Sequence, residues 1–592
     1  MCGIIGCCAS SSIKDILING LERLEYRGYD SSGISYIENG KIITYKSVGK
    51  LINLKNKTKD ININSSIGIG HNRWATHGEP SLENAHPHIS NNKKISLVHN
   101  GIIENHLEIK ELLLRQNTSF YGKTDTEVIV KYIEYIYKGN PLDSLLTLNK
   151  VLKGTYALCI IFLDHPNKIF FLKKGSPLLI GKGKEEIYLS SDIFSLQDYT
   201  NLFLYLKDNQ YGYISNNYYQ VFENGNPINT SLEIYNSRQI LEQLTSYNSY
   251  LEKEIYESKD VIKNIITKHI KDSKIDFSKY KINKVIDNIE NIVLLGCGSS
   301  YHSALIGKYI FEDLCKIPSS TYIASEFPYT PIIKKTNTLY ILISQSGETA
   351  DLISCLPLLD DFKLGIINVK NSSLSLKMDD NFFLEAGSEI SVATTKAYLG
   401  QLTFLYLLGI YIANKKKLIS KEYCLSLTQE LESIPNKIKQ ILDNHQEIKD
   451  FSNIIKNYKN VFFIGRNLDY LTCLEGSLKL KEVTYIHSEA IPSGELKHGT
   501  ISLIDQDVYT IALLSSNLRN KTKSNIKEVE SRKGKVFTIS TNDSNYNIPS
   551  TLEILYPLLQ IIPLQLLSLY TAENKKLDID KPRNLAKSVT VE

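Results

Sequence analysis

The sequence predicts an α/β protein in which a strand-rich first part precedes two copies of a doubly wound parallel-sheet domain. Three observations support this fold class. The chain has 592 residues, a length typical of three or four domains. Short apolar runs bounded by Gly, Asn and Asp, which are typical of strands, dominate the part up to about residue 215. The second half contains two similar stretches that each combine an apolar strand, a Gly-containing turn and a helix.

The composition is that of an ordinary globular protein and argues against several kinds of partner. A net charge of +4 over this length is close to neutral, so we expect neither nucleic acid nor a membrane surface as a partner. The nine cysteines form no Cys-x-x-Cys pairs, which argues against a zinc site and favours a reducing compartment, the cytoplasm. No basic segment leads into an apolar core at the N-terminus, so we expect no signal peptide.

Two apolar stretches raise the alternative of membrane spans. They are "YLGQLTFLYLLGIYIAN" at 398–414 and "ILYPLLQIIPLQLLSLY" at 554–570. Both are shorter than the roughly 20 residues that usually span a bilayer, and both contain glutamine. We therefore expect two buried helices.

The first part mixes helical and strand patterns. The stretch "SSIKDILINGLERLEY" has apolar residues at helical spacing and predicts a helix. By contrast, "KIITYKSVG", "ISLVHNGIIEN" and "ALCIIFLD" predict strands. Residues of about 217–285 are polar and helical in texture, including "SYLEKEIYESKDVIKNIITKHI", and we expect them to connect the two halves.

The internal repeat begins at Asn291 with "NIVLLGCGSSYHSALIGKYIFE" and again at Asn460 with "NVFFIGRNLDYLTCLEGSLKLK". Aligned without gaps, the two stretches share a glycine directly after the apolar strand (Gly296 and Gly465) and a second glycine within the helix (Gly307 and Gly476). Further on, "TLYILISQSGET" aligns with "DVYTIALLSSNL". Two copies of one doubly wound domain follow, and ligands are expected at the carboxyl ends of their strands.

Cys2, in the opening "MCGIIGCCAS", has two interpretations. A small hydrophobic residue at the start of an edge strand is the simpler one. The chemical one requires removal of Met1, which leaves a thiol and a free α-amine on one residue. An α-amine has a pKa of about 8, low enough to act as the base that activates the thiol.

Three polar motifs in the first part suit amide hydrolysis by a thiol: "GIGHNRWATHGEPSLENAHPH" (68–88), "VHNGIIENH" (98–106) and "KTDTEVI" (123–129). An oxyanion needs fixed donors, and the Asn100 side chain beside the Gly101 N–H supplies two. Arg73 is suited to a substrate carboxylate and Asp125 to an ammonium group. A solvated loop is the alternative for each motif taken alone.

The stretches "CGIIG", "LERLEYRGYDSSG", "RWATHGEPSLENAHPH" and "HNGIIENH" resemble the glutaminase domain of the N-terminal-nucleophile (Ntn) amidotransferases. The resemblance implies a four-layer αββα Ntn-hydrolase fold, with Cys2 as nucleophile and Asn100 and Gly101 as oxyanion hole. It implies that Arg27 orders the loop beside Cys2 and that Trp74 gates an ammonia passage; a core aromatic is the alternative for Trp74. The residues that it assigns to the α-groups of glutamine are Arg73, Thr76, His77, Gly101 and Asp125.

The stretch "SQSGETAD" (344–351) follows an apolar strand in the first copy of the repeat. Hydroxyls and backbone N–H groups at such a strand-to-helix turn can bind a phosphate, although Ser and Thr here could also be helix N-caps. The second copy has "SSNLR" instead, so we expect one phosphate site per chain. A resemblance to sugar isomerase domains assigns the sugar phosphate to Ser300, Ser344, Gln345, Ser346, Thr349, Val392 and Thr394, the last where the family has Ser.

Acid–base groups gather in the second copy, within "LKLKEVTYIHSEAIPSGELKHGT" (478–500). Lys479 and Glu482 are three residues apart and share a helix face. A surface ion pair is the alternative, but apolar neighbours and a following loop with His498 favour a site. The C-terminal "DIDKPRNLAKSVTVE" resembles the family's tail that covers the sugar site, with Lys587 as its Schiff-base lysine.

The resemblance runs the full length to the amidotransferases that aminate and isomerise D-fructose 6-phosphate with L-glutamine, without metal or organic cofactor. It implies a cytoplasmic homodimer. The domains we expect are a glutaminase domain at 2–217, a connector at 218–285, sugar isomerase domains at 286–425 and 453–582, and a tail at 583–592. Two other functions stay open: an amidotransferase with another phosphosugar acceptor, and a sugar-phosphate sensor without catalysis.

Overall fold

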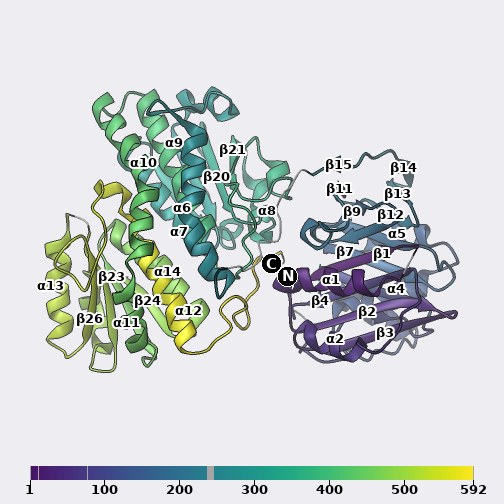
Figure 1. Ribbon diagram of the computed structural model, residues 1–592. Coiled ribbons are helices and arrows are strands. Elements are labelled where there is room, and N and C mark those ends of the chain that lie inside the picture. The colour runs from purple at the N-terminus through teal and green to yellow at the C-terminus, as the bar shows by residue number, and fades with distance from the viewer. Residues whose placement is uncertain (1, 11, 76–77, 236–245, 516, 591–592) are drawn as a thin grey trace. The chain divides into compact units, whose positions relative to one another are not determined.

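The computed structural model describes residues 2–10, 12–75, 78–235, 246–515 and 517–590 (Figure 1). The chain divides into two units. The first comprises Met1–Ile240 and Ala586–Glu592, and the second comprises Leu241–Leu585.

Two antiparallel sheets form the first unit. One has eight strands in the order β15-β11-β9-β10-β1-β4-β2-β3, and the other has seven in the order β14-β13-β12-β8-β7-β6-β5. The strands are β1 (Gly3–Cys8), β2 (Ser31–Glu38), β3 (Lys41–Val48), β4 (Ile67–Arg73), β5 (His88–Ile89), β6 (Ile95–Ile103), β7 (Gly154–Phe162), β8 (Ile169–Lys174), β9 (Leu179–Lys182), β10 (Ile187–Ser190), β11 (Leu202–Tyr205), β12 (Tyr211–Ser215), β13 (Tyr218–Glu223), β14 (Asn226–Ile228) and β15 (Glu233–Ile234).

The sheets stack face to face, and helices cover their outer faces (Figure 1). Strand β1 shows why: Ile5 packs with Leu17 of a covering helix, whereas Ile4 and Cys8 point into the core between the sheets beside Phe171. This alternation is the period of two that a strand buried on both faces requires. The predicted four-layer αββα arrangement is confirmed. The helices are α1 (Lys14–Leu24), α2 (Leu51–Thr58), α3 (His106–Arg115), α4 (Asp125–Ile136) and α5 (Pro141–Val151).

The first unit extends beyond residue 217, where we expected a connector to begin. Strands β13 and β14 form a hairpin that completes the seven-stranded sheet, and β15 pairs with β11 of the other sheet. The hairpin turn is at Asn224 and Gly225, with φ angles of 51° and 88°. Asn-Gly between two strands is a strong hairpin signal, because both turn residues need positive φ. The prediction of a helical connector after residue 217 did not take this Asn-Gly dipeptide into account.

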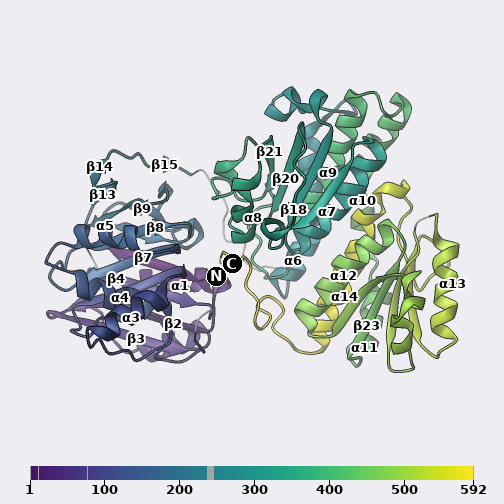
Figure 2. The same cartoon turned by 180° about the vertical axis from the view of Figure 1, so that it is seen from behind.

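Two parallel five-stranded sheets form the second unit (Figure 2). Their orders, β19-β18-β20-β21-β22 and β24-β23-β25-β26-β27, are both 2-1-3-4-5 in chain sequence. The predicted repeat of a doubly wound domain is therefore confirmed. The strands are β18 (Asn291–Gly296), β19 (Ser319–Ile323), β20 (Thr338–Ser344), β21 (Lys363–Ile367), β22 (Asp380–Phe383), β23 (Asn460–Gly465), β24 (His487–Pro492), β25 (Tyr509–Leu513), β26 (Lys535–Ser540) and β27 (Tyr546–Asn547), with a separate pair β16 (Ile270–Lys271) and β17 (Lys274–Ile275).

Helices cover both faces of each parallel sheet. In the first copy α7 and α9 pack on one face and α8 on the other, as Figure 2 shows, and in the second copy α12 and α14 oppose α13 in the same way. One apolar core runs through the α9 and α14 layers and joins the two copies. The helices are α6 (Tyr250–His269), α7 (Ser299–Leu314), α8 (Ala350–Cys355), α9 (Lys396–Lys415), α10 (Lys421–Asp443), α11 (Gln446–Ile455), α12 (Leu468–Thr484), α13 (Arg519–Glu530) and α14 (Tyr556–Asn574).

The two apolar stretches form the helices α9 and α14. Among the described residues, they are the two helices long and apolar enough to cross a membrane, but 89% and 100% of their apolar windows are buried inside the protein. Their all-round apolar surfaces pack against neighbouring helices, as the sequence predicts.

Strand-to-helix turns at the same place in both copies form the sheet edge where ligands are expected. A Cβ on Gly296 or Gly465 would lie 2.7 Å from the backbone of the following helix. Two residues after each of these glycines, the backbone has a φ of 54° in both copies, at Gly298 and at Asn467. The turns therefore bring the helix N-terminus close to the strand end, at the point where strand order reverses.

The core between the two antiparallel sheets should dominate the stability of the first unit. Leu189 on β10 is fully buried there, so Leu189→Ala should lower the free energy of unfolding by about 3 kcal/mol. Leu107 on α3 is 63% exposed, so Leu107→Ala should change it by less than about 0.5 kcal/mol. Urea unfolding of both variants tests this, and equal losses would contradict the layer assignment.

Candidate active sites

Cys2 immediately precedes β1, and its sulfur lies against the backbone of Trp74. The Trp74 N–H donates to Sγ at 3.3 Å, and the thiol lies 3.6 Å from the Trp74 carbonyl oxygen. Burial raises the pKa of the Cys2 thiol, while the Trp74 N–H and the Arg73 guanidinium act in the opposite direction. A base beside the thiol is therefore needed to make a thiolate at neutral pH.

Asn100 and Gly101 on β6 lie beside Cys2. The Asn100 side chain is 3% exposed, and its Nδ2 donates to the Cys2 carbonyl oxygen at 2.9 Å. Gly101 has φ of 130°, and a Cβ there would lie 2.0 Å from the Thr155 carbonyl oxygen. Only glycine fits at this position, because any side chain would collide with backbone. The structure thus brings the two predicted oxyanion donors next to the predicted nucleophile.

Arg73 and Asp125 also lie close to Cys2, since they shift the pKa of its thiol in opposite directions. Arg73 ends β4, is 3% exposed and donates from Nη2 to the Gly78 carbonyl oxygen at 3.0 Å. Asp125 opens helix α4 and accepts from the Ile103 N–H at 2.9 Å. A buried cation and a buried carboxylate flank the thiol, as recognition of an α-amino acid requires. Predicted residues Thr76 and His77 lie outside the described residues.

The loop beside Cys2 is held by a residue that the sequence analysis did not single out. Asp30, in "YRGYDSSG", accepts from the Ala75 N–H at 2.8 Å and so fixes the segment after Trp74. Arg27, which we expected in this role, pairs with Asp192 at 2.5 Å. The available signal for Asp30 was its place inside the quoted motif, three residues after Arg27.

The turn after β20 holds the predicted phosphate hydroxyls in one compact loop. Ser344 Oγ accepts from the Gly347 N–H at 2.9 Å and lies 3.1 Å from the Thr349 hydroxyl. Ser346 Oγ accepts from the Glu348 N–H at 3.1 Å. Hydroxyls and N–H groups in this geometry line the carboxyl end of a central strand, the position where doubly wound sheets bind ligands.

The two copies differ in charge at the start of the helix that follows their first strand. Ser300 Oγ accepts from Gln401 Nε2 at 3.1 Å in the first copy. At the equivalent position of the second copy Asp469 accepts from Gln560 Nε2 at 2.5 Å. A buried carboxylate disfavours a phosphate dianion, so the expected single phosphate site agrees with this difference.

Val392 and Thr394 lie in the loop that precedes α9. The Val392 N–H donates to the Asp580 carbonyl oxygen at 3.0 Å, which ties this loop to the segment before the C-terminal tail. The Glu389 carboxylate accepts from the Thr395 and Ala397 N–H groups at 3.0 and 3.1 Å. The loop is therefore fixed from both sides at the N-terminus of α9.

Lys479 is the centre of a buried charged cluster that spans both copies. Its Nζ lies 2.7 Å from Glu482 and 3.3 Å from Glu475, and it donates to Ser299 Oγ at 3.0 Å. Glu475 also bonds Ser299 and the His302 ring at 2.7 Å each. Burial by itself lowers the pKa of Lys479, but the two carboxylates outweigh it and raise that pKa. The lysine therefore stays charged.

This cluster excludes the alternative of a surface ion pair for Lys479 and Glu482, because Lys479 is 2% exposed. Glu475, Ser299 and His302 were missed by the sequence analysis. The available signal for Glu475 was its position four residues before Lys479 on the same helix face.

The other two residues predicted for this site, His498 and Lys587, lie outside α12. His498 lies exposed in the short 3-10 turn Glu495–His498, and its ring makes no hydrogen bond or ion pair with any described residue. Lys587 is half-buried in Ala586–Glu592, the segment that groups with the first unit.

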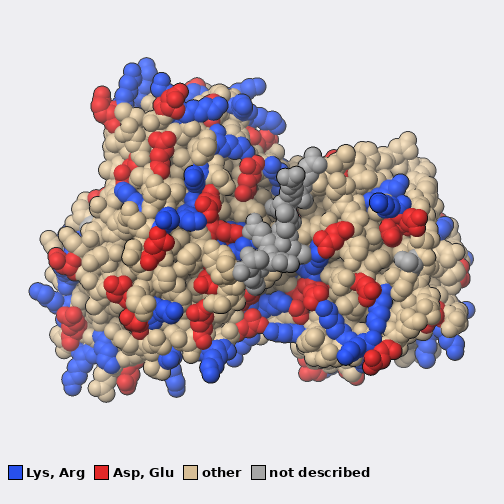
Figure 3. Space-filling view, in the orientation of Figure 1, with Lys and Arg blue, Asp and Glu red and all other residues tan. Residues whose placement is uncertain are grey.

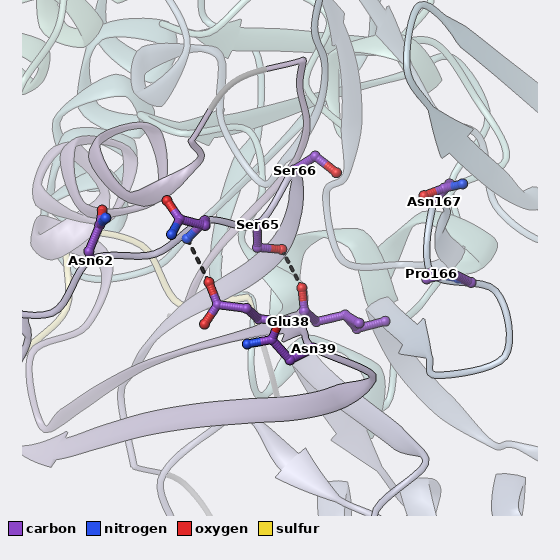
Figure 4. Close-up of a pocket in the computed structure, with 9 residues that line it drawn as sticks. Glu38, Asn39, Asn62, Ser65, Ser66, Pro166 and Asn167 are labelled. Atoms are coloured by element: carbon purple, nitrogen blue, oxygen red, sulfur yellow. Dashed lines mark hydrogen bonds between the residues drawn. The ribbon is translucent and has the colours of Figure 1, made fainter.

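A polar cavity of about 370 Å³ lies in the first unit, and none of the predicted site residues lines it (Figure 4). Two of its polar groups already have partners: the Glu38 carboxylate accepts from the Asn64 N–H, and Ser65 Oγ donates to the Ile37 carbonyl, both at 2.7 Å. These bonds hold the strand ends together. The lining residues are Ile37, Glu38, Asn39, Asn62, Asn64, Ser65, Ser66, Pro166 and Asn167.

Comparison with protein families and with proteins of assigned function agrees with both halves of this description. The profile of the glutamine amidotransferase domain matches residues 71–198, and that of the SIS domain matches 286–411 and 454–570. A glutamine–fructose-6-phosphate aminotransferase [isomerizing] of Clostridium tetani is 42% identical over the full length of both chains. The enzyme of the same name from Buchnera aphidicola is 40% identical, again over both full lengths. The chain belongs to the glutamine–fructose-6-phosphate aminotransferase family.

A solved structure supports the fold of the second unit. This chain is similar to the C-terminal domain of glucosamine-fructose-6-phosphate aminotransferase from Francisella tularensis, at 35% identity and a TM-score of 0.55. The match covers 57% of this chain and 99% of that domain.

Removal of Glu475 should show how much stability is lost when the buried cluster is left without one of its carboxylates. Glu475→Ala leaves Lys479 and His302 with a partner fewer in a site closed to water, so the free energy of unfolding should fall by about 3 kcal/mol. Asp443→Ala breaks another i,i+4 pair, with Lys439, in which both side chains are more than half exposed; the loss should stay below about 0.5 kcal/mol. Urea unfolding compares the two, and similar losses would argue against a buried pair.

The same cluster predicts a pH dependence. Burial would raise the pKa of Glu475, but Lys479 and His302 outweigh it and hold the pKa below its ordinary value of 4.5. The stability that the ionised carboxylate contributes is thus complete above pH 4.5 and is lost as pH falls below it. The difference in unfolding free energy between wild type and Glu475→Gln should therefore shrink on going from pH 7 to below pH 4.5; a difference that grows would contradict the assignment.

Proposed function

We propose that the chain converts D-fructose 6-phosphate and L-glutamine into D-glucosamine 6-phosphate and L-glutamate, the first step of hexosamine biosynthesis. The observation that carries this function is the pairing of two sites in one chain. Cys2 lies beside Asn100 and Gly101 in one unit, and in the other a buried lysine–carboxylate cluster bonds Ser299, the residue before Ser300. The full-length relatives named for this reaction support the assignment.

At the first site, Cys2 attacks the side-chain amide of glutamine. Its own α-amine, exposed once Met1 is removed, takes the thiol proton. Asn100 Nδ2 and the Gly101 N–H stabilise the oxyanion of the tetrahedral intermediate, and ammonia leaves. Water then releases glutamate from the thioester.

The α-groups of glutamine are held by buried charges. Arg73 takes the carboxylate and Asp125 the ammonium group, with Thr76, His77 and Gly101 completing the contacts. Trp74, whose backbone contacts the Cys2 sulfur, is the gate of the ammonia passage. Arg27 is assigned to ordering of the neighbouring loop.

At the second site, the sugar phosphate is held by hydroxyls and N–H groups at a helix N-terminus. The residues assigned to the sugar phosphate are Ser300, Ser344, Gln345, Ser346, Thr349, Val392 and Thr394. His498 assists ring opening, and Lys587 forms an imine at C2 of the open-chain ketose with loss of water. Ammonia displaces the lysine, Glu482 moves a proton from C1 to C2, and Lys479 neutralises the developing charge. The scheme uses neither metal nor organic cofactor.

The chain is further assigned as a cytoplasmic homodimer without nucleic acid or membrane partners. On the face in Figure 3, Lys and Arg mix with Asp and Glu and form no continuous basic surface of the kind that nucleic acid needs. The proposed domains are the glutaminase domain at 2–217, continued by β13 to β15, SIS domains at 286–425 and 453–582, and the tail at 583–592.

A product assay distinguishes this function from its two rivals. Incubation with glutamine and fructose 6-phosphate should yield glutamate and glucosamine 6-phosphate in equal amounts. Glutamate without the amino sugar would favour another phosphosugar acceptor, and neither product would favour a sensor.

Loss of the nucleophile should abolish the first half-reaction alone. Cys2→Ala should reduce glutamate formation by at least about 1,000-fold, because the covalent route is removed, while the second site still accepts added ammonia. N-terminal mass spectrometry of the wild type should find Cys2 as the first residue. Active protein that retains Met1 would contradict the α-amine as base.

Loss of the imine lysine should have the opposite effect. Lys587→Ala should lower amino-sugar formation by at least about 1,000-fold, because the imine cannot form, while glutamine hydrolysis continues. Borohydride should trap a sugar adduct on Lys587 in the wild type and none in the variant. A variant that forms the amino sugar at the wild-type rate would eliminate this lysine.

A further inference from the structure

His71 on β4 lies behind the amide that faces the nucleophile. The side chain is fully buried, and its Nε2 lies 2.9 Å from the His99 carbonyl oxygen and 3.1 Å from Asn100 Oδ1. A carbonyl oxygen and an amide oxygen both accept, so Nε2 must carry the proton that they share. The other ring nitrogen, Nδ1, is buried and has no hydrogen-bond partner among the described residues.

The surroundings keep the His71 ring neutral. Burial lowers the pKa of His71 to about 3, so the imidazolium is not populated near pH 7. The ring of His86 stacks on it with centroids 4.1 Å apart. The His99 N–H donates to His86 Nδ1 at 3.4 Å, so that nitrogen is an acceptor and His86 is neutral too. His71 is therefore a neutral ring with a single, fixed donor.

That donor determines which way the Asn100 amide points. With Oδ1 taking the proton of His71, Nδ2 is directed to the Cys2 end, where it donates to the Cys2 carbonyl oxygen at 2.9 Å. Rotation of the amide by half a turn would place its NH₂ group against the His71 N–H, donor against donor, and would present an oxygen to the nucleophile. A buried clash of this kind costs roughly 1–3 kcal/mol, enough to keep the amide in one orientation.

We propose that His71 is a positioning residue that aims the Asn100 amide N–H at the oxyanion formed on attack by Cys2. The proposal rests on the proposed function of the Cys2 site. His71 does not touch the substrate; it acts by occupying the amide oxygen, so that only a donor faces the reacting carbon. The effect belongs to the transition state, because the oxyanion does not exist in bound glutamine.

Two substitutions of similar size test this. Leucine at position 71 has no donor, whereas the Nε2 of glutamine can reach the place of the histidine Nε2. For glutamine hydrolysis, His71→Leu should lower kcat by about 100-fold, the loss expected for one oxyanion donor, with KM changed by less than about twofold. His71→Gln should recover kcat to within about 10-fold of wild type.

Three further measurements separate positioning from structural damage. Alkylation of Cys2 by iodoacetamide forms no oxyanion, so its rate should be unchanged in both variants. In an Asn100→Ala background, His71→Leu should cause little further loss of kcat, because the donor is already absent. Should His71→Leu fail to fold, His71→Asn provides a shorter amide that cannot reach Asn100, and its kcat should also fall about 100-fold.

The proposal is overturned if folded His71→Leu keeps kcat within about threefold of wild type, or if His71→Gln loses as much as His71→Leu. It is also overturned if the losses of His71→Leu and Asn100→Ala multiply in the double variant. Cys2→Ala distinguishes these outcomes from failure of the proposed function. If glutamine hydrolysis survives in Cys2→Ala, the proposed function of the first site is wrong, irrespective of the results for the His71 variants.

Discussion

The charged cluster around Lys479 is the interaction on which the second unit depends. Taking Lys479 and Glu475 out of water costs several kcal/mol per ion, and only close pairing with further hydrogen bonds offsets this. Those bonds require both copies of the repeat, because the two charges come from the second copy while Ser299 and His302 come from the first. The apolar core shared by α9, α12 and α14 holds the helices where the pairing is possible. A slip of one copy against the other would leave charges buried without partners.

Duplication has produced two similar edges with different chemistry. Both copies keep the strand order, the close-packed glycine and the positive-φ turn residue. At the start of the following helix, the first copy has a neutral hydroxyl at Ser300, suited to a dianion, and the second has a carboxylate at Asp469. The second copy instead buries Glu475 and Lys479 about two and three turns further along that helix, at positions that face the first copy. The two copies of one fold thus present different groups, hydroxyls at the turn in the first and buried charges in the second.

In the first unit the site depends on stacking rather than on duplication. Cys2 precedes β1 of one sheet, and Asn100 belongs to β6 of the other. Only the face-to-face packing of the two sheets brings the Asn100 amide within hydrogen-bonding distance of the Cys2 carbonyl oxygen. A few buried hydrogen bonds then determine direction as well as position, since an amide is a donor on one side and an acceptor on the other.

The sequence by itself determined the repeat, the helices and strands with clear period, and the motifs that contain Cys2, Asn100, Arg73 and Asp125. These are local signals, carried by spacing and by residue type. It did not reveal β13 and β14, because the Asn224–Gly225 turn was read as part of a polar connector. Nor did it reveal Glu475 or His71. A buried carboxylate and a surface one look alike in a sequence, and so do a neutral histidine and a charged one. Their roles follow from burial and from the partners that segments distant in the chain supply, and only the tertiary structure decides both.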